Sequence, residues 1–189
     1  VLAMSRLTFR ILDVIYALGL GLLLSPFILA VALFVLLREG PPVFYGSERM
    51  HDPVRSFTLW KFRTMRPTER DGGVTGGDKA ARITSTGAWL RRTRLDELPQ
   101  IWNVLIGQMS LVGPRPVTEP ELAMYGHHKS AYLSVRPGVT GMWQVHGRMS
   151  GCYKNRVQLD RGYLDAISLK SDIKLIGQTA LSVIRMTGC

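Results

Sequence analysis

The longest hydrophobic pattern of the chain lies near its N-terminus, where no charged residue occurs from Val14 to Leu37. At the rise of an α-helix this run would extend about 36 Å, enough to cross a hydrocarbon core of about 30 Å. Ser25 and Pro26 lie almost at its centre. Proline lacks an N–H group and clashes with the carbonyl four residues earlier. The pattern therefore predicts a membrane element of residues 1–39 that is kinked or broken near its middle.

Three interpretations of this element stay open on the pattern alone. A signal peptide is disfavoured, because cleavage after residues 30–32 would leave an apolar new terminus. A single transmembrane helix is the usual structure of such a run. A re-entrant hairpin is slightly favoured by the flanking charges, because Arg6 and Arg10 precede the run and Arg38 follows it. Positive charge prefers the cytoplasmic side, so both ends would lie on one face.

After residue 40 the hydrophobic positions form shorter runs, of the kinds that predict strands and helices. Strands are expected at residues 43–45, 57–63 and 139–145, and helices at residues 84–92, 99–106, 118–125 and 169–183. The last helix is amphipathic, so it either packs in the core or lies along a lipid interface. Together these runs predict an α/β fold, a small irregular sheet with surrounding helices, in one domain of residues 40–189.

The net charge of the chain indicates which kind of molecule it binds. The chain has 24 Lys and Arg against 14 Asp and Glu, a formal charge of +10. It should therefore bind an anion such as nucleic acid, anionic lipid or a phosphorylated substrate. Nucleic acid is disfavoured, because the sequence contains neither a helix-turn-helix nor an RNA-binding aromatic motif. Cys152 and Cys189 suggest neither a disulfide framework nor a metal cluster.

The strongest candidate for chemistry is the adjacent pair Asp96 and Glu97. Three arginines lie within the five residues before it, and Pro99 opens a predicted helix just after it. Simple charge complementation of that helix is the plainer explanation, since the helix dipole favours anions at its N-terminus. In this cationic field, however, an aspartate would stay ionised and could act as a nucleophile or a metal ligand in phosphate chemistry.

Further cationic residues lie on a predicted strand or next to proline and glycine, which restrict or shape the backbone. Lys61 and Arg63 flank one residue of a predicted strand, so their side chains should point the same way. Arg115 lies between two prolines, and Arg136 and Arg148 adjoin Pro or Gly. Each cation alone is explained by an exposed surface. Together they predict a phosphate-binding site, because guanidinium groups bind phosphate oxygens in bidentate fashion.

With these motifs the chain resembles the bacterial sugar transferases of the monotopic phosphoglycosyl transferase family, which start exopolysaccharide and glycan assembly. The shared motifs are Lys-Phe-Arg-Thr-Met from Lys61, Leu-Asp-Glu-Leu-Pro-Gln from Leu95, Met-Ser-Leu-Val-Gly-Pro-Arg-Pro from Met109 and Arg-Pro-Gly-Val-Thr-Gly from Arg136. They occur in the same order and cover nearly the whole chain. The chain departs from the pattern at residues 149 and 150, where it has Met-Ser and many relatives have Asn-Asp.

The resemblance implies a re-entrant hairpin broken at Ser25-Pro26 and a catalytic domain docked by lipid contacts on the cytoplasmic face of the bacterial inner membrane. It implies transfer of a sugar-1-phosphate, of the hexose type, from a UDP-sugar to polyprenyl (undecaprenyl) phosphate. Asp96 resembles the nucleophile that attacks the β-phosphate, releases UMP and forms a covalent phosphosugar intermediate; Glu97 resembles its supporting partner or base. Mg²⁺ is the implied metal, bridging Asp96 and phosphate oxygens. The implied phosphate-binding residues are Lys61, Arg63, Arg91, Arg115, Arg136 and Arg148.

Two rival hypotheses make different predictions. A non-enzymatic basic membrane protein that binds anionic lipid or nucleic acid would not need Asp96, and its binding would fall steeply with salt. A transferase without a covalent intermediate would release UMP only when the lipid acceptor is present. The sequence leaves open the sugar, the nucleotide, the polyprenol length, the glycan pathway, the oligomeric state, and whether the chain is complete or the catalytic part of a longer protein.

Overall fold

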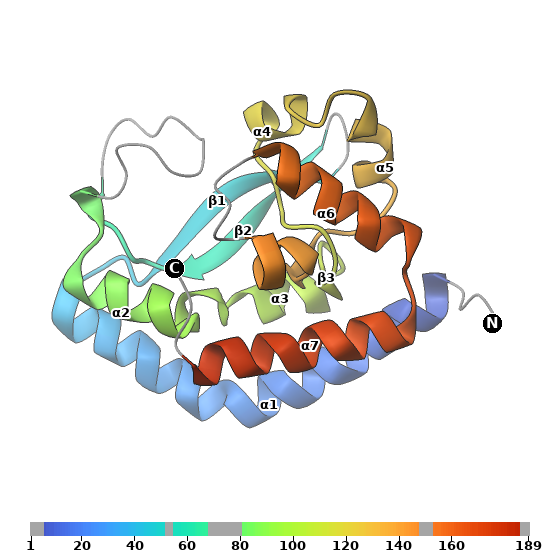
Figure 1. Cartoon of the computed structure of the whole chain (residues 1–189). Coiled ribbons are helices and arrows are strands. Elements are labelled where there is room, and N and C mark those ends of the chain that lie inside the picture. Colours follow the sequence, from blue (N-terminus) through green and yellow to red (C-terminus); the bar gives the residue numbers. More distant parts are fainter. Residues whose placement is uncertain (1–5, 52–54, 68–80, 148–152, 186–189) are drawn as a thin grey trace.

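The computed structural model describes residues 6–51, 55–67, 81–147 and 153–185 (Figure 1). The helical elements, with η2 and η3 as 3-10 turns and η4 as a π-helical turn, are α1 (Arg6–Glu39), α2 (Ser85–Thr93), η2 (Leu95–Glu97), α3 (Gln100–Leu105), α4 (Glu119–Ala123), η3 (Gly126–His128), α5 (Lys129–Leu133), η4 (Trp143–Gly147), α6 (Tyr153–Asp165) and α7 (Leu169–Ile184). The strands are β1 (Phe44–Met50), β2 (Ser56–Phe62), β3 (Ser110–Val112) and β4 (Gly138–Thr140).

Two small sheets lie among these helices, in agreement with the expected α/β fold. Strands β1 and β2 form an antiparallel pair in which Phe44 lies opposite Phe62, and β3 pairs with β4 in parallel. The expected strand at residues 139–145 is wrong beyond Thr140, because the chain leaves β4 and forms the π-helical turn η4. The expected helix after Thr118 is confirmed, and Thr118 forms a capping box with Glu121 at its start.

Helix α1 is continuous, so the expected break into two helices at Ser25-Pro26 is not present. Pro26 cannot donate a hydrogen bond to the carbonyl of Leu22, four residues earlier. The Ser25 hydroxyl donates to that same Leu22 oxygen at 2.8 Å and so replaces the missing donor. The helix bends near its middle (Figure 1) but remains helical across the proline.

Both ends of α1 are bonded to the same domain. Near its start, Arg10 donates to the carbonyls of Val104 and Leu105 at 2.6 and 2.9 Å, which are the last residues of α3. Asp13 accepts from the Ser110 hydroxyl at 2.5 Å. After its last residue, Arg63 donates to three successive carbonyls, those of residues 39, 40 and 41, at 2.6 to 2.8 Å. The helix therefore lies along the domain over its whole length instead of projecting from it.

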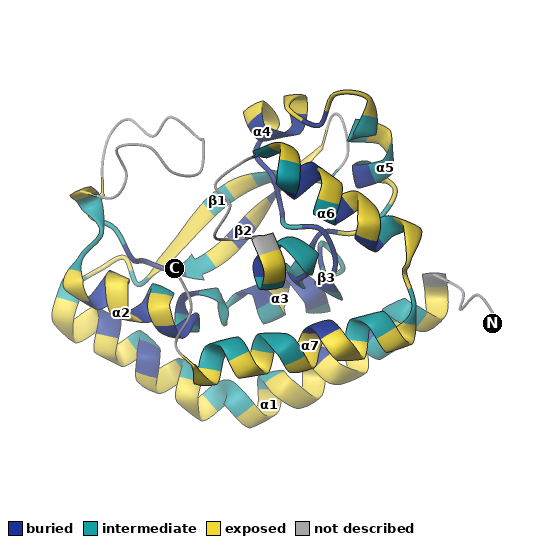
Figure 2. Cartoon of the chain, in the orientation of Figure 1, coloured by how far each residue is buried: buried dark blue, intermediate teal, exposed yellow. Residues whose placement is uncertain are grey.

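The inner side of α1 forms part of the core, and its outer side is open. Ala17, Val31 and Val35 are buried against β2, α2 and α3. Within the described residues, α1 is the one helix long and apolar enough to cross a membrane, and only 11% of its apolar window is buried. That fraction excludes the buried core helix of a soluble protein. Figure 2 shows the exposed residues along its outer side.

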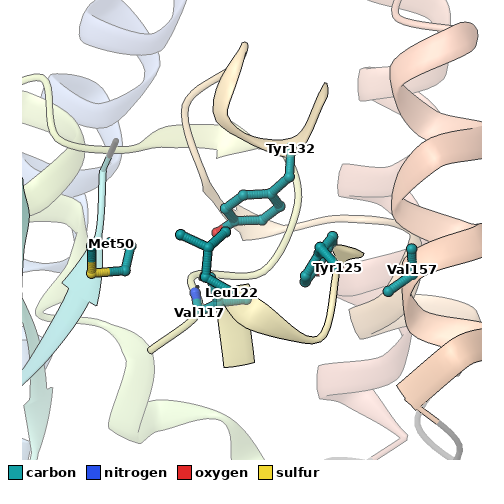
Figure 3. Close-up of a cluster of buried hydrophobic side chains, with 6 residues drawn as sticks. All are labelled: Met50, Val117, Leu122, Tyr125, Tyr132 and Val157. Atoms are coloured by element: carbon teal, nitrogen blue, oxygen red, sulfur yellow. Dashed lines mark hydrogen bonds between the residues drawn. The ribbon is translucent and has the colours of Figure 1, made fainter. Parts of the chain in front are cut away.

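A second core lies at the opposite end of the molecule, around α4, α5 and α6. Six buried side chains form it, and Figure 3 shows them converging from β1, the segment before α4, and these helices. They are Met50, Val117, Leu122, Tyr125, Tyr132 and Val157. This cluster joins the end of β1 to the C-terminal half of the chain. A backbone hydrogen bond of 2.9 Å from Met50 N to the Val117 carbonyl adds to the same connection.

Glycines let the loop that carries Arg115 pack against β4 without side chains between the backbones. Gly113 N donates to Thr140 O at 2.9 Å, and Gly138 N donates to Pro114 O at 2.8 Å. A Cβ added to Gly138 would lie 2.1 Å from the nitrogen of Gly113, a distance that no real contact allows. The close approach fixes where Arg115 enters the site.

We expect Gly138→Ala to lower the free energy of unfolding by about 2–3 kcal/mol, because the new methyl group overlaps backbone that cannot move. Thermal unfolding of the full chain in detergent measures the effect. Gly162→Ala is the matched control, since nothing lies within 4 Å of its added Cβ in α6. It should raise stability by about 0.5–1 kcal/mol. Equal effects of the two substitutions would contradict the packing described.

Candidate functional site

A left-handed residue places Asp96 and Glu97 at the site. Arg94, with φ 58°, ends α2 and begins η2, and its backbone N–H donates to Arg91 O. Residues other than glycine rarely adopt this conformation. The buried Arg94 guanidinium supports it by donating to the Gln144 carbonyl at 3.1 Å. The turn therefore depends on a contact between η2 and the distant η4, and it directs the next residues inward.

Lys61 brings the two adjacent carboxylates together. Its Nζ lies 3.1 Å from Glu97 Oε1 and 3.8 Å from Asp96 Oδ2. Arg115 approaches Glu97 Oε1 from the other side, with its NH1 at 3.6 Å. Asp96 is only 6% exposed. The cluster thus contains two acidic and two basic side chains that are largely removed from water. Removing charges from water costs free energy, so such a cluster is a candidate functional site.

Burial and charge act in opposite directions on Asp96. Burial raises the pKa of this carboxyl group most strongly, and neighbouring Glu97 raises it further. Lys61 is the cation that most lowers the pKa, and Arg91 and Arg115 add to its effect. The net shift is upward, so Asp96 is a more basic, poorly solvated carboxylate that three cations help to keep ionised. Such a group is suited to nucleophilic attack.

A polar pocket opens beside this cluster. Its empty volume, including the open mouth, is about 230 Å³. The lining residues come from β1, β2, η2, α3, β4, η4 and the Arg115 loop: Arg49, Leu59, Lys61, Glu97, Gln100, Arg115, Pro116, Gly138, Val139 and Gln144. Three of them are cations and one is an acid, so the pocket favours an anionic ligand.

The cations predicted from the sequence have different positions in the structure. Lys61 and Arg115 line the pocket. Arg91 lies behind it, donates from Nε to the Thr64 hydroxyl at 2.9 Å, and helps keep Asp96 ionised. The exposed Arg136 donates to the Gly107 carbonyl at 2.9 Å and does not line the pocket.

Arg63 and Arg148 were also predicted to bind phosphate. The structure does not bring Arg63 to the pocket: its guanidinium is buried and occupied by the carbonyls at the end of α1. Arg63 lies one residue beyond β2, so the strand alternation that places Lys61 does not extend to it. Arg148 lies outside the described residues.

Sequence reasoning missed Arg49, Gln100 and Gln144 as pocket residues. Gln100 ends the motif that begins at Leu95, and Gln144 follows three residues after the motif that begins at Arg136, so their positions are the signal that could have identified them. Gln144 is almost completely buried, and its Oε1 has no hydrogen-bond partner among the described residues. Arg49 carried no such signal, because an arginine on a short strand is usually solvated.

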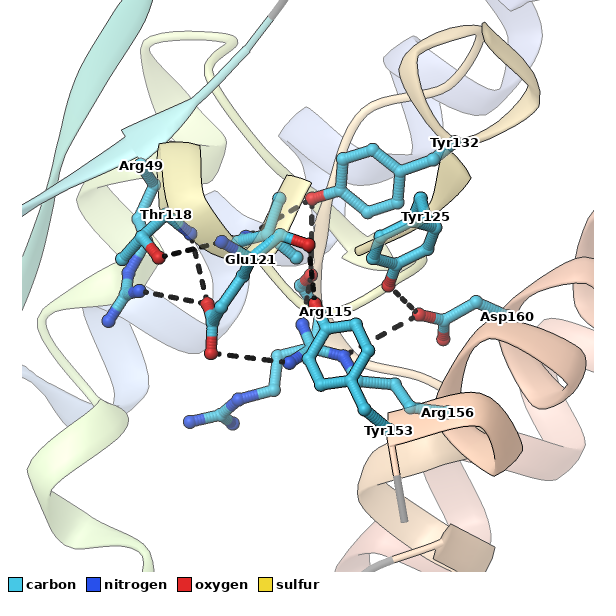
Figure 4. Close-up of polar contacts among 10 residues, drawn as sticks. Arg49, Arg115, Thr118, Glu121, Tyr125, Tyr132, Tyr153, Arg156 and Asp160 are labelled. Carbon is cyan, nitrogen blue, oxygen red and sulfur yellow. Dashed lines mark hydrogen bonds and ion pairs between the residues drawn. The ribbon is translucent and has the colours of Figure 1, made fainter. Parts of the chain in front are cut away.

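A buried polar network holds the Arg115 loop (Figure 4). The Arg115 carbonyl accepts from the Tyr132 hydroxyl and from Arg156 NH2, both at 3.1 Å. Asp160 accepts from the Tyr125 hydroxyl at 2.6 Å and lies 3.9 Å from Arg156 Nε. Burial raises the pKa of Asp160 to about 6, although the Tyr125 hydroxyl and Arg156 oppose the shift. The network supports the site from behind, outside the pocket lining.

The acidic pair fits Mg²⁺ only together with a ligand. Among the described residues, no group of three or more His, Cys, Asp or Glu side chains is placed to hold a metal ion. Mg²⁺ commonly binds one or two carboxylates and completes its shell with water and substrate phosphates. Asp96 and Glu97 supply oxygen donors of this kind at the pocket, and phosphate oxygens would supply others.

Comparisons with known proteins agree with one another. A sequence model of the bacterial sugar transferase family matches residues 4–186. The UDP-galactose-lipid carrier transferase of Erwinia amylovora is 38% identical over 97% of the chain, and the exopolysaccharide production protein ExoY of Rhizobium meliloti is 37% identical over 95%. The UDP-glucose:undecaprenyl-phosphate glucose-1-phosphate transferase of Escherichia coli is 36% identical over 91%.

These relatives differ in length. The chain spans 42% of the Erwinia protein and 39% of the Escherichia protein, but 86% of ExoY. The region matched by the family model, residues 4–186, includes α1, the acidic pair and the pocket residues.

We expect Asp96→Asn to raise the melting temperature at pH 8. The folded-state pKa of Asp96 lies above its unfolded value, so ionised Asp96 disfavours folding once the pH exceeds that folded pKa. Removing the charge should therefore raise the melting temperature above that of the parent. The gain should disappear toward pH 4, where the parent carboxyl becomes protonated.

Glu97→Gln is the control for this measurement. It removes the closest partner of Lys61 and the partner of Arg115, so it should lower the melting temperature at the same pH. A drop for Asp96→Asn of the same size would show that Asp96 stabilises the fold as an ordinary ion pair.

Proposed function

The chain belongs to the bacterial sugar transferase family, and from that premise we propose that it transfers a sugar-1-phosphate from a UDP-sugar to polyprenyl (undecaprenyl) phosphate. The observation that carries the proposal is the buried Asp96 held between cations beside an anion-binding pocket. The names of the Erwinia and Escherichia relatives, which specify UDP-galactose and UDP-glucose, support a hexose-1-phosphate as the transferred group.

In the proposed first step, a carboxylate oxygen of Asp96 attacks the β-phosphorus of the UDP-sugar. A new oxygen–phosphorus bond forms, the bond from the β-phosphorus to the bridging oxygen breaks, and UMP leaves with that oxygen. The product on the protein is an acyl phosphate, in which the Asp96 carboxylate oxygen is bonded to the phosphorus of the sugar-1-phosphate. Lys61 and Arg115 are placed to hold phosphate oxygens during this step, because both line the pocket and contact the acidic pair.

In the second step, a phosphate oxygen of polyprenyl phosphate attacks the same phosphorus. The bond to Asp96 breaks, and the carboxylate returns to its ionised form. Glu97 keeps Lys61 and Arg115 oriented through its two ion pairs, and it is also the group placed to accept a proton from the acceptor phosphate. Mg²⁺ bound by Asp96 and Glu97 would neutralise phosphate charge.

The exposed apolar surface supports a membrane location. The outer side of α1 is exposed (Figure 2), and further exposed hydrophobic side chains lie on α3, directly after it and on α7: Trp102, Ile106, Ile173, Ile176, Leu181 and Ile184. Because both ends of α1 are bonded to one domain, we propose that α1 enters and leaves the same leaflet. The domain would then lie on the cytoplasmic face of the inner membrane, where UDP-sugars are made and the acceptor's phosphate is accessible.

The rival hypotheses explain fewer of these observations. A basic protein that only binds anionic lipid or nucleic acid gives no reason for a buried carboxylate with a raised pKa beside the pocket. Direct transfer without a covalent intermediate would use the same cations but would leave Asp96 as a metal ligand only. These hypotheses differ in what happens when donor is supplied without acceptor.

We expect the full chain in nanodiscs with Mg²⁺ to release UMP from UDP-glucose or UDP-galactose without acceptor, in an amount near one equivalent. Intact-protein mass spectrometry should then show a phosphohexose adduct, and peptide mapping should place it on Asp96. Asp96→Asn should show neither product. Release that strictly requires polyprenyl phosphate, with no adduct, would support direct transfer; an active Asp96→Asn variant would exclude the covalent mechanism.

Lys61→Met should move the acid limb of UMP release to higher pH. Asp96 must be ionised to attack, so the rate falls as the pH drops through its pKa, and Lys61 is the cation that most lowers that pKa. The single-turnover rate at saturating donor, measured across pH, tests this. Lys170→Met on the exposed start of α7 should leave the limb unchanged, and an unshifted limb in Lys61→Met would contradict the assigned role.

A further inference from the structure

Arg49 of β1 lies outside the motifs of the sequence analysis and also lines the pocket. It lines the pocket together with Lys61 and Arg115, so three cations face a ligand space that contains one acid, Glu97. Its side chain is 14% exposed and forms part of the pocket lining. Arg49 is therefore not an ordinary solvated residue of a surface strand.

Glu121 holds Arg49 in this orientation. Arg49 NH1 lies 3.5 Å from Glu121 Oε2. That carboxylate is 2% exposed; the same oxygen accepts from Thr118 N at 3.0 Å, and the other oxygen lies 3.7 Å from Arg156 NH1. Figure 4 shows Glu121 between the two guanidinium groups. One carboxylate is thus shared by two cations and neutralises neither fully.

The remaining donors and charge of Arg49 indicate an anionic ligand. Its Nε is buried and has no hydrogen-bond partner among the described residues, and a buried unpaired donor is costly. Burial lowers the pKa of Arg49 most, Arg115 lowers it next, and Glu121 opposes them. Arginine stays charged in proteins, so Arg49 and Arg115 repel each other. An anion bound between them would offset that repulsion.

We propose that Arg49 is a further substrate-binding residue, whose guanidinium donates to phosphate oxygens in the pocket alongside Arg115, and that Glu121 is its positioning residue. The inference deepens the proposed function and rests on it for the identity of the substrate. The phosphate group could belong to the UDP-sugar donor or to the polyprenyl phosphate acceptor. The planar fork of arginine suits either group, because it offers two parallel donors to two phosphate oxygens.

Equilibrium binding to the full chain in nanodiscs tests the proposal without requiring turnover. The probes are UDP, for the donor side, and a short-chain polyprenyl phosphate, for the acceptor side. Arg49→Met keeps most of the covered stem and removes the charge; it should weaken the binding of one probe at least tenfold. Whichever probe weakens identifies the source of the phosphate. Arg161→Met, on the exposed side of α6, is the matched control and should bind both probes as the parent does.

Glu121→Gln tests the positioning role. Glutamine can still complete the capping box of α4, so the helix should remain intact. The variant should weaken the same probe as Arg49→Met, and the double variant should bind no more weakly than Arg49→Met alone. If Glu121 served only the fold, the two losses would add.

The outcomes separate this inference from the proposed function. If Arg49→Met has a parent-like melting temperature and binds both probes with parent affinity, the inference is overturned. If Arg49→Met does not fold, Arg49→Lys replaces it, and the single point charge should still weaken binding severalfold because it lacks the fork. If the parent releases UMP from no donor while UDP binding still depends on Arg49, the anion site stands and the proposed activity fails.

Discussion

The hydrogen bonds that tie both ends of α1 to one domain are the constraint on which the rest of the structure depends. Arg10 and Asp13 fix its start to α3 and β3, and Arg63 fixes its end. An apolar helix of this length could cross a bilayer if it were straight and free. Bonded at both ends, it lies against the domain with its outer side exposed. In the membrane arrangement proposed above, where that side faces lipid, the fold itself sets the depth of the pocket relative to the membrane.

The second organising feature is a set of charges removed from water. Lys61, Asp96, Glu97 and Arg115 contact one another at the pocket, and a network around Glu121 and Arg156 supports them from behind. Burying such charges does not in general stabilise a protein compared with apolar packing. In the proposed transfer their value is positional, because Lys61 and Arg115 already line the pocket before a phosphate group binds there. The network links this arrangement to α4 and α6, so parts of the chain far from the motifs contribute to the site.

Sequence patterns predicted the local motifs of the site better than the long-range contacts that bring them together. The pair Asp96-Glu97 and the stiff loop at Arg115 are local features, and the structure places Glu97 and Arg115 at the pocket and Asp96 beside it. Arg63 was expected at the pocket from strand alternation, but the strand ends one residue before it. Arg49 could not be identified, because its role depends on Glu121, 72 residues away. Local sequence contains no record of such long-range contacts.

The apolar N-terminal helix is a second case in which the local sequence pattern did not reveal the contacts that determine the structure. A proline in the middle of an apolar run predicted a break, yet the neighbouring Ser25 hydroxyl satisfies the carbonyl that Pro26 leaves without a donor, and the helix continues with a bend. Whether such a helix spans or re-enters is decided by what its ends bind. Arg10 and Arg63 bind the two ends of α1 to one domain, and the proposed re-entrant topology rests on these contacts. In the sequence, Arg10 looked like a flanking charge and Arg63 like a phosphate-binding residue.

The most direct test of this account is the sidedness of the two ends of α1. Single cysteines at Leu7, Leu22 and Arg38, all exposed positions, would be introduced after the native cysteines are replaced by serine. A membrane-impermeant maleimide would be applied to spheroplasts and to inside-out vesicles. The account predicts that Leu7→Cys and Arg38→Cys react only in inside-out vesicles, while Leu22→Cys is protected in both. Labelling of the two ends from opposite sides would show a spanning helix and contradict the account.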